Sequence, residues 1–317
     1  MHLGFDVGGT KTDAVVVAHA GEILARVRRP TAWGAEAVVA TLVDVVTELA
    51  AEVGCAPVEF TSIGIGMPGQ VAPGTARVTH AVNLGIEELD LRAAIGPVFG
   101  VPVRAENDVK AAAVGAFALR AAAAATPTDA LPSSMAYLNL GTGVAAGLVT
   151  DGVLWRGARG TAGEVGHISI DPNGPVCRCG QRGCIEAFAG GGAVARRWGT
   201  PGALPVRDVF DAADAGDAAA VELRRGLAYG VAAAVRVLVL SADVETVVLG
   251  GGVTALGDRM LNHVVTELEA SAAASAFLRS LHLPERIELL PAGSPAAALG
   301  AALVGATTHE QEALAHG

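Results

Sequence analysis

The 317-residue sequence predicts an α/β protein built from two similar lobes. Short runs rich in β-branched residues end at glycine turns, and longer apolar runs with helical spacing follow them. Strands and helices in this order are typical of α/β folds. The pattern occurs once in each half of the chain, which we interpret as a weak internal duplication. A chain of this length can bury the cores of two domains.

Each half is expected to begin with two strands joined by a tight glycine turn. The first half gives Leu3 to Val7, Gly8-Gly9-Thr10 and Thr12 to Ala18. The second half gives Met135 to Leu140, Gly141-Thr142-Gly143 and Val144 to Thr150. A later strand in each half also ends in glycines: Ser62 to Gly66 before Met67-Pro68-Gly69, and Thr246 to Leu249 before Gly250-Gly251-Gly252.

Apolar periodicity and capping residues predict four helices. They cover Ala35 to Val53, Asn107 to Ala125, Ala218 to Leu240, and a C-terminal run to about Ala306. Ser294-Pro295 is expected to supply the cap and first turn of the last helix. The stretch Ala121 to Pro132 is rich in small residues and proline, so we expect a surface loop that ends the first half.

Composition argues against a nucleic-acid or membrane partner. The formal net charge of -10 and the pI near 5.3 oppose an extended nucleic-acid surface. The mean hydropathy is +0.46, but prolines and glycines interrupt the two uncharged runs, residues 130–150 and 289–308. With no secretory leader expected, we predict a cytoplasmic protein. Alanine- and glycine-rich helices make a homodimer the expected assembly.

The most specific chemical signal is a cluster of three cysteines preceded by a histidine. The residues are Glu164-Val165-Gly166-His167, Cys177, Cys179 and Cys184. Zinc prefers four tetrahedral ligands drawn from thiolate and imidazole, and this set supplies Cys3His with no open coordination position. Gly180 and Gly183 allow the loop to fold tightly enough for the sulfurs to converge. We therefore predict a structural zinc site.

The alternative interpretation of this cluster is a disulfide bond. A disulfide would leave one of the three cysteines unpaired, and it would need an oxidising compartment. Cys55 lies far away in the sequence, and we expect an inert buried thiol there. Glu164 and Glu186 flank the ligand set, so fixing the metal loop would also fix two carboxylates that can accept hydrogen bonds from hydroxyls.

The two glycine turns suit phosphate oxygens. Asp6-Val7-Gly8-Gly9-Thr10-Lys11 places backbone N–H groups beside a hydroxyl and an ammonium, with Asp6 turned towards hydrated magnesium. Gly-Gly between strands is more often a simple hairpin, but the equivalent Gly141-Thr142-Gly143 turn favours a polyphosphate clamp. Both turns belong to hairpins separate from the cysteine loop, so we expect nucleotide binding to survive loss of the metal.

A catalytic base is expected where Arg104-Ala105-Glu106-Asn107-Asp108 ends a strand immediately before a helix. Phosphoryl transfer to an alcohol needs a carboxylate that takes the hydroxyl proton, and Asp108 is the candidate. In the alternative reading, Asn107 or Asp108 serves only as a helix cap.

These motifs stand in the order seen in the ROK family of bacterial sugar kinases and regulators, which the sequence resembles over nearly its whole length. The resemblance implies an α/β, two-lobed actin/hexokinase/Hsp70-like ATPase fold with an interlobe cleft. It implies a small lobe of residues 1–118 with 298–317, and a large lobe of residues 119–297 that carries the zinc site.

The resemblance also implies the role of each site residue. Asp108 would be the catalytic base, and the sugar hydroxyls would be bound by Asn83, Asn107, Asp108, Glu164, His167 and Glu186. Zinc would be held by His167, Cys177, Cys179 and Cys184. The phosphates would be held by Gly8, Gly9, Thr10, Lys11, Gly141, Thr142 and Gly143. Asp6 would face magnesium, and Gly251 and Gly252 would lie near the adenosine.

The implied activity is ATP-dependent transfer of the γ-phosphoryl group to a hydroxyl, the 6-hydroxyl, of glucose or an N-acetylhexosamine, with structural zinc and Mg-ATP. A sugar-responsive regulator without turnover is the alternative class, and polyphosphate is an alternative donor. Regulators in the family usually carry an N-terminal DNA-binding helix-turn-helix. We expect none before Leu3, which together with Asp108 favours the kinase. Spacing does not name the sugar, because discrimination at its 2-position depends on loop shape.

Overall fold

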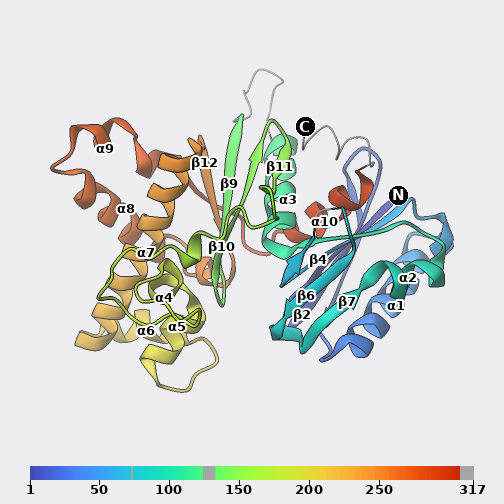
Figure 1. Cartoon of the computed structure of the whole chain (residues 1–317), viewed down its shortest axis with the longest axis horizontal. Coiled ribbons are helices and arrows are strands. Elements are labelled where there is room, and N and C mark those ends of the chain that lie inside the picture. The colour runs from blue at the N-terminus through green and yellow to red at the C-terminus, as the bar shows by residue number, and fades with distance from the viewer. Residues whose placement is uncertain (73, 124–132, 308–317) are drawn as a thin grey trace. The chain divides into compact units, whose positions relative to one another are not determined.

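The computed structural model describes residues 1–72, 74–123 and 133–307 (Figure 1). The chain forms two compact units. The first contains Met1–Leu131, Gly147–Ala162 and Gly293–Gly317, and the second contains Pro132–Ala146 and Gly163–Ala292. The lobe boundaries predicted from the sequence stay a prediction, and residues 124–132 of the predicted loop lie outside the described residues.

A five-stranded sheet forms the centre of the first unit, in the order β3-β2-β1-β4-β8. Its strands are β1 (His2–Val7), β2 (Lys11–Val17), β3 (Ile23–Pro30), β4 (Ser62–Met67) and β8 (Val103–Asn107). The first three pair antiparallel, whereas β1, β4 and β8 run parallel. Parallel neighbours need crossover connections, which contain α1 (Ala35–Glu52) and α2 (Leu91–Phe99).

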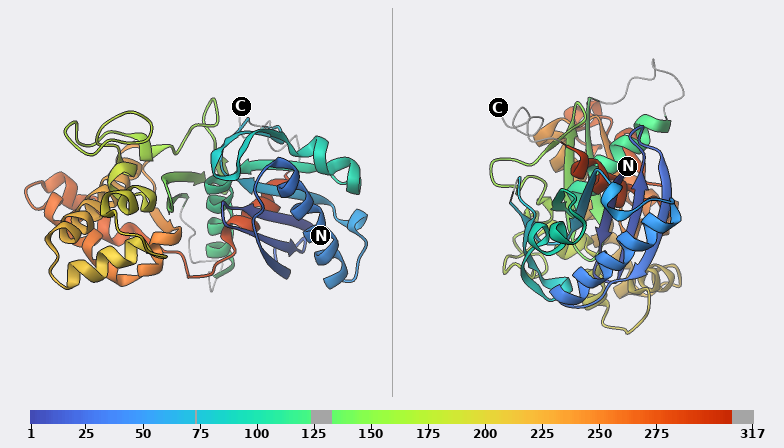
Figure 2. Two further views of the ribbon diagram at one scale, coloured as in Figure 1. Left: turned by 90° about the horizontal axis from the view of Figure 1, so that it is seen from below. Right: turned by 90° about the vertical axis from the view of Figure 1, so that its right-hand side faces the viewer.

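The two faces of this sheet pack against different helices (Figures 1 and 2). Along β2, Ala14 and Val16 belong to the core shared with α1, whereas Val15 and Val17 pack with Ala302 of α10 (Ala296–Ala306). Successive side chains of a strand point to opposite faces, so this alternation places α1 and α10 on opposite sides of the sheet.

The helix α10 approaches its neighbours at glycines that leave no room for a side chain. A Cβ added at Gly300 would lie 1.7 Å from the carbonyl oxygen of Ala111 in α3 (Asp108–Ala123). A Cβ added at Gly64 of β4 would lie 1.7 Å from the carbonyl oxygen of Ala301. Because backbone atoms in a packed core have little freedom to move away, only glycine allows these approaches.

Replacing Gly300 by alanine is expected to destabilise the protein by about 3 kcal/mol or more, because the new methyl overlaps a backbone oxygen. Thermal unfolding should show a melting temperature lower by about 6 °C or more. Gly96→Ala in α2 is the matched control, since the nearest atom is 4.0 Å from the added Cβ and alanine favours a helix. A Gly300→Ala protein that melts with the wild type would contradict this packing.

A small antiparallel sheet also belongs to the first unit and is made of β5 (Gln70–Val71), β6 (Arg77–Ala81) and β7 (Ile86–Asp90). A 3-10 helix, Val82–Leu84, joins β6 to β7 and carries Asn83. The sequence pattern predicts none of these elements, because each is too short to show a period.

The second five-stranded sheet has the order β11-β10-β9-β12-β13. Its strands are β9 (Ser134–Leu140), β10 (Val144–Thr150), β11 (Val153–Trp155), β12 (Thr246–Gly250) and β13 (Ile287–Leu289). β12 runs parallel to β9 and to β13. The helices of the second unit are α4 (Ile185–Ala189), α5 (Gly191–Trp198), α6 (Pro205–Asp214), α7 (Ala218–Ala242), α8 (Asp258–Ala272) and α9 (Ala276–Ser280).

Among the described helices, α7 is the one that is long and apolar enough to cross a membrane by length and composition. In its apolar window, 56% of the residues are buried inside the structure, as in the core helix of a folded domain.

The predicted strands and helices that flank the glycine turns are confirmed. The predicted start of the C-terminal helix is wrong by one residue. Pro295 is the N-cap of α10, and no side chain caps this end. The Ser294 hydroxyl is buried and has no hydrogen-bond partner among the described residues. The helix begins one residue later than predicted, so Ser294 stands before the cap position and does not bond the first N–H groups.

Candidate functional site

The carboxyl ends of three parallel strands meet at one edge of the first sheet. In the register, Asp6 of β1 lies beside Gly66 of β4, and Met67 of β4 lies beside Asn107 of β8. Asp108 follows as the first residue of α3. Side chains at this edge of a parallel sheet commonly form binding sites. The structure therefore brings together the predicted base and the residue predicted to face magnesium.

Asn107 fixes the junction between β8 and α3. Its Oδ1 accepts hydrogen bonds from the N–H groups of Val109 and Lys110, at 3.1 and 3.2 Å. Its Nδ2 donates to the carbonyl of Gly69 at 3.2 Å. Asn107 is thus a helix cap, and within the described residues one hydrogen of its Nδ2 is left to donate to another acceptor. Asn107 can therefore cap α3 through Oδ1 and still bind a ligand through Nδ2.

Asp6 lies in an environment that opposes its own negative charge. Burial, followed by the charge of Asp108, raises the pKa of Asp6 to about 7. A bound cation would favour the ionised carboxylate, because opposite charges stabilise each other where solvent is excluded. The pair of carboxylates therefore fits a divalent cation such as magnesium.

Replacing Asp6 by asparagine is expected to stabilise the free protein at pH 8. A carboxyl whose pKa is higher in the folded state loses stability as pH rises from about 4 to about 7, because the folded state binds more protons over that range. Asparagine removes this penalty, so the melting temperature should rise by about 2–4 °C at pH 8 and converge with the wild type near pH 4. Thermal scans without magnesium or nucleotide test this; a variant that melts below the wild type at pH 8 would count against it.

The turn between β1 and β2 has the form of an anion cradle. The Gly8 N–H donates to the Lys11 carbonyl at 2.9 Å and closes the hairpin. Within the described part of the chain, the exposed Gly9 and Thr10 N–H groups donate to no protein acceptor. Asn83 adjoins this turn, since a Cβ at Gly9 would lie 3.4 Å from its Cβ. Such N–H groups suit phosphate oxygens.

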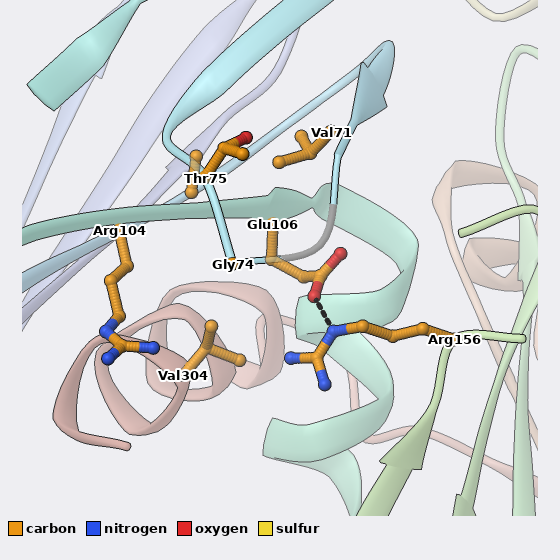
Figure 3. Close-up of a pocket in the computed structure, with 8 residues that line it drawn as sticks. Val71, Gly74, Thr75, Arg104, Glu106, Arg156 and Val304 are labelled. Atoms are coloured by element: carbon orange, nitrogen blue, oxygen red, sulfur yellow. Dashed lines mark hydrogen bonds and ion pairs between the residues drawn. The ribbon is translucent and has the colours of Figure 1, made fainter. Parts of the chain in front are cut away.

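Two contacts that were not predicted from the sequence connect residues 156–160 to the same strand–helix junction. Figure 3 shows the first of them, between Arg156 and Glu106. Arg156 Nε donates to Glu106 Oε2 at 2.7 Å, and the other oxygen of Glu106 accepts the Asn107 N–H at 2.9 Å. The buried Lys110 donates through Nζ to the Gly160 carbonyl at 2.5 Å. A sequence signal existed for Lys110, because it is the only charge between Asp108 and Arg120 in an apolar helix.

The predicted zinc ligands converge in the second unit. The ligand atoms of His167, Cys177, Cys179 and Cys184 all lie within 4.8 Å of one another. Cys179 Sγ is 3.6 Å from Cys184 Sγ, and Cys177 Sγ is 4.0 Å from His167 Nδ1. Two sulfurs about 2.3 Å from one tetrahedral zinc are about 3.8 Å apart, so the spacing fits this metal.

The disulfide alternative does not fit this geometry. A sulfur separation of 3.6 Å far exceeds the bond length of about 2.05 Å, and the four thiols are free. Hydrogen bonding from the Gln181 backbone lowers the pKa of Cys179 to about 6, whereas burial raises the pKa of Cys177 and raises that of Cys184 to about 12. Cys179 is therefore the thiol of this cluster that ionises most readily. The expectation that Cys55 is buried is wrong, because its side chain is partly exposed. Partial burial still raises the pKa of its thiol.

Glycine conformation closes the metal loop as predicted. Gly180 and Gly183 have φ angles of 93° and 70°. A Cβ at Gly183 would lie 1.7 Å from the Asp171 carbonyl oxygen, so no other residue fits there.

The second glycine turn is hydrogen-bonded to the segment that follows the cysteines, and our expectation of separate hairpins did not include these contacts. Glu186, two residues after Cys184, accepts the Val144 N–H through Oε2 at 3.0 Å. The carbonyls of Gly141 and Thr142 accept N–H groups of Gly191 and Gly192, at 2.8 and 3.0 Å. The turn is therefore held by the helices that follow the cysteines. The sequence predicted the hairpin around Gly141–Gly143, but it did not predict these hydrogen bonds to residues more than 40 positions away.

The remaining predicted residues of the second unit have distinct surroundings. Glu164 is exposed and precedes the 3-10 helix Val165–His167. Gly251, with a φ of 92°, packs on the end of β9, where a Cβ would lie 2.6 Å from the Leu140 carbonyl oxygen. Gly252 has open space around it. The predicted site residues thus form two groups: Asp6 to Lys11, Asn83, Asn107 and Asp108 in the first unit, and the others in the second.

The fold and these two groups define an α/β protein with two candidate phosphate turns and a Cys3His loop. The sequence matches the ROK family over residues 2–307, and the chain belongs to this family. It is 31% identical over 290 residues to a glucokinase of Halalkalibacterium halodurans, covering 86% of each chain. It is 31% identical over 255 residues to an N-acetylmannosamine kinase of Haemophilus influenzae, covering 79% of this chain and 80% of the relative.

A solved structure agrees with these relatives. A ROK family glucokinase from Streptomyces griseus, in complex with glucose and AMPPNP, has a TM-score of 0.75 and 28% identity, covering 96% of this chain and 98% of that one. The predicted fold class and the resemblance to the ROK family are confirmed.

Proposed function

We propose that this protein is an ATP-dependent sugar kinase that transfers the γ-phosphoryl group to the 6-hydroxyl of glucose or an N-acetylhexosamine. The observation that carries the proposal is the pairing of Asp108 with Asp6 at the edge where β1, β4 and β8 end. Asp108, as the base for an alcohol, and Asp6, as a carboxylate suited to magnesium, would act together at this edge. The kinase relatives at 31% identity support the same activity.

In the proposed reaction, the sugar hydroxyl oxygen forms a bond to the γ-phosphorus while the bond to the β,γ-bridging oxygen breaks. Asp108 takes the hydroxyl proton, and ADP leaves. The N–H groups of Gly9 and Thr10 would bind phosphate oxygens beside Lys11, and Thr142 and Gly143 would do so in the second turn. Magnesium, held through Asp6, would neutralise phosphate charge.

Zinc in the Cys3His loop would be structural, because four protein ligands leave no open position. His167, Cys177, Cys179 and Cys184 would hold it. The sugar hydroxyls would be bound by Asn83, Asn107, Glu164, His167 and Glu186, several of which are carboxylates or amides that accept hydroxyl hydrogens. Gly251 and Gly252 would adjoin the adenosine. A homodimer in the cytoplasm remains part of the proposal.

A coupled assay of ADP release over glucose, mannose, N-acetylglucosamine and N-acetylmannosamine tests the activity. We expect turnover of about 1–100 per second with at least one sugar. Polyphosphate in place of ATP tests the donor. Sugar binding by calorimetry without turnover under any donor would favour a sugar-responsive regulator and overturn the kinase.

A further inference from the structure

The segment that follows the cysteine loop, residues 184–192, is hydrogen-bonded to the second glycine turn and the residue after it. The loop ends at Cys184, which is the N-cap of the five-residue helix α4. Glu186 lies in the first turn of α4, and Gly190 then leads directly into α5. Residues 184–192 are thus a short, continuous connection from a metal ligand to the turn.

Three hydrogen bonds fasten this connection to the turn. Glu186 Oε2 accepts the Val144 N–H, and the first N–H groups of α5 donate to the carbonyls of Gly141 and Thr142. A Cβ at Gly143 would lie only 2.5 Å from Glu186 Oε2, so the carboxylate lies directly against the turn. Among the described residues, the Thr142 and Gly143 N–H groups donate to no protein acceptor. The carbonyls are occupied from the protein side, while these two donors are left for an anion.

We propose that Glu186 is a positioning residue for the nucleotide, in addition to any contact with the sugar. It holds the Gly141–Gly143 turn in the shape that presents the Thr142 and Gly143 N–H groups to phosphate. Cys184 is the N-cap of α4, the helix that carries Glu186. Ordering of the cysteine loop by zinc would therefore support nucleotide binding as well as sugar binding. The inference rests on the proposed function, since it assigns the turn to the phosphates of ATP.

The test is calorimetric binding of a non-hydrolysable ATP analogue with magnesium and without sugar, on protein with measured zinc content. Glu186→Ala should weaken nucleotide binding about tenfold or more, because it removes a charge-assisted hydrogen bond to Val144. Glu186→Gln keeps an acceptor oxygen and should stay within about threefold of the wild type. Glu164→Ala is the matched control: it should lose sugar affinity and keep nucleotide affinity within about twofold, because Glu164 makes no described bond to the turn.

Removal of zinc from the wild-type protein by a chelator provides a second test that needs no variant. Nucleotide affinity should fall by a similar factor and return when zinc is restored. If both Glu186→Ala with its zinc retained and the zinc-free wild type bind nucleotide within about twofold of the holoprotein, the inference is overturned while the kinase proposal stands. A zinc-loaded wild type that binds no nucleotide would instead overturn the proposed function itself.

Discussion

Asp108→Asn is expected to lower kcat by about 10²–10⁴-fold, because asparagine cannot take the proton of the attacking hydroxyl. Sugar binding should stay within about tenfold of the wild type, since the carboxamide keeps the shape and an acceptor oxygen. The fold should also survive. Asn107 supplies two hydrogen bonds to the start of α3, and asparagine at position 108 keeps an oxygen that can accept the Val109 N–H, as Asp108 Oδ1 does at 2.9 Å.

Steady-state kinetics with the preferred sugar, together with calorimetric sugar binding, measure both effects. Asp44→Asn, on the exposed side of α1, is a matched control with the same chemical change and should keep wild-type turnover. An Asp108→Asn enzyme with near wild-type kcat would remove Asp108 from the role of base. A loss of sugar binding equal to the loss of turnover would instead indicate a role in the ground state.

Cys184→Ser is expected to abolish zinc binding and to lower the melting temperature by about 10 °C or more. Cys184 is fully buried, and a structural metal contributes its binding free energy to folding. Sugar affinity should fall by at least about 100-fold, because the loop that orders His167 and Glu186 is released. Nucleotide affinity should fall as well, in contrast to what separate hairpins would predict, because α4 and α5 hold the Gly141–Gly143 turn.

Elemental analysis, thermal scans and titrations of sugar and nucleotide measure these changes. Cys55→Ser is the matched control, since Cys55 belongs to the first unit, whereas the four predicted ligands belong to the second. It should retain one zinc per chain and both affinities. A wild-type protein purified from zinc-containing medium without bound zinc would refute the metal assignment, as would a metal-free Cys184→Ser protein with normal sugar affinity.

The elements that were predicted well are those whose formation depends on residues close together in the sequence. The strands around Gly8-Gly9-Thr10 and Gly141-Thr142-Gly143 followed from β-branched runs broken by glycine. The long helix α7 followed from apolar periodicity over many residues. The small sheet of β5, β6 and β7 escaped prediction because two-residue and five-residue strands carry too little pattern. Ser294 was misplaced as a cap because helix boundaries shift by a residue without a change in composition.

The sequence by itself determined the chemistry of the candidate Cys3His ligand set and the order of the predicted site motifs along the chain. Cysteine spacing is local, and Gly180 and Gly183 let three thiols meet within one short loop. The tertiary structure alone decided which distant groups act together. The raised pKa of Asp6 depends on burial and on Asp108, which lies 102 positions away in the sequence but at the same sheet edge. The bond from Glu186 to Val144 likewise joins a helix to a hairpin, and such pairings depend on packing rather than on local preference.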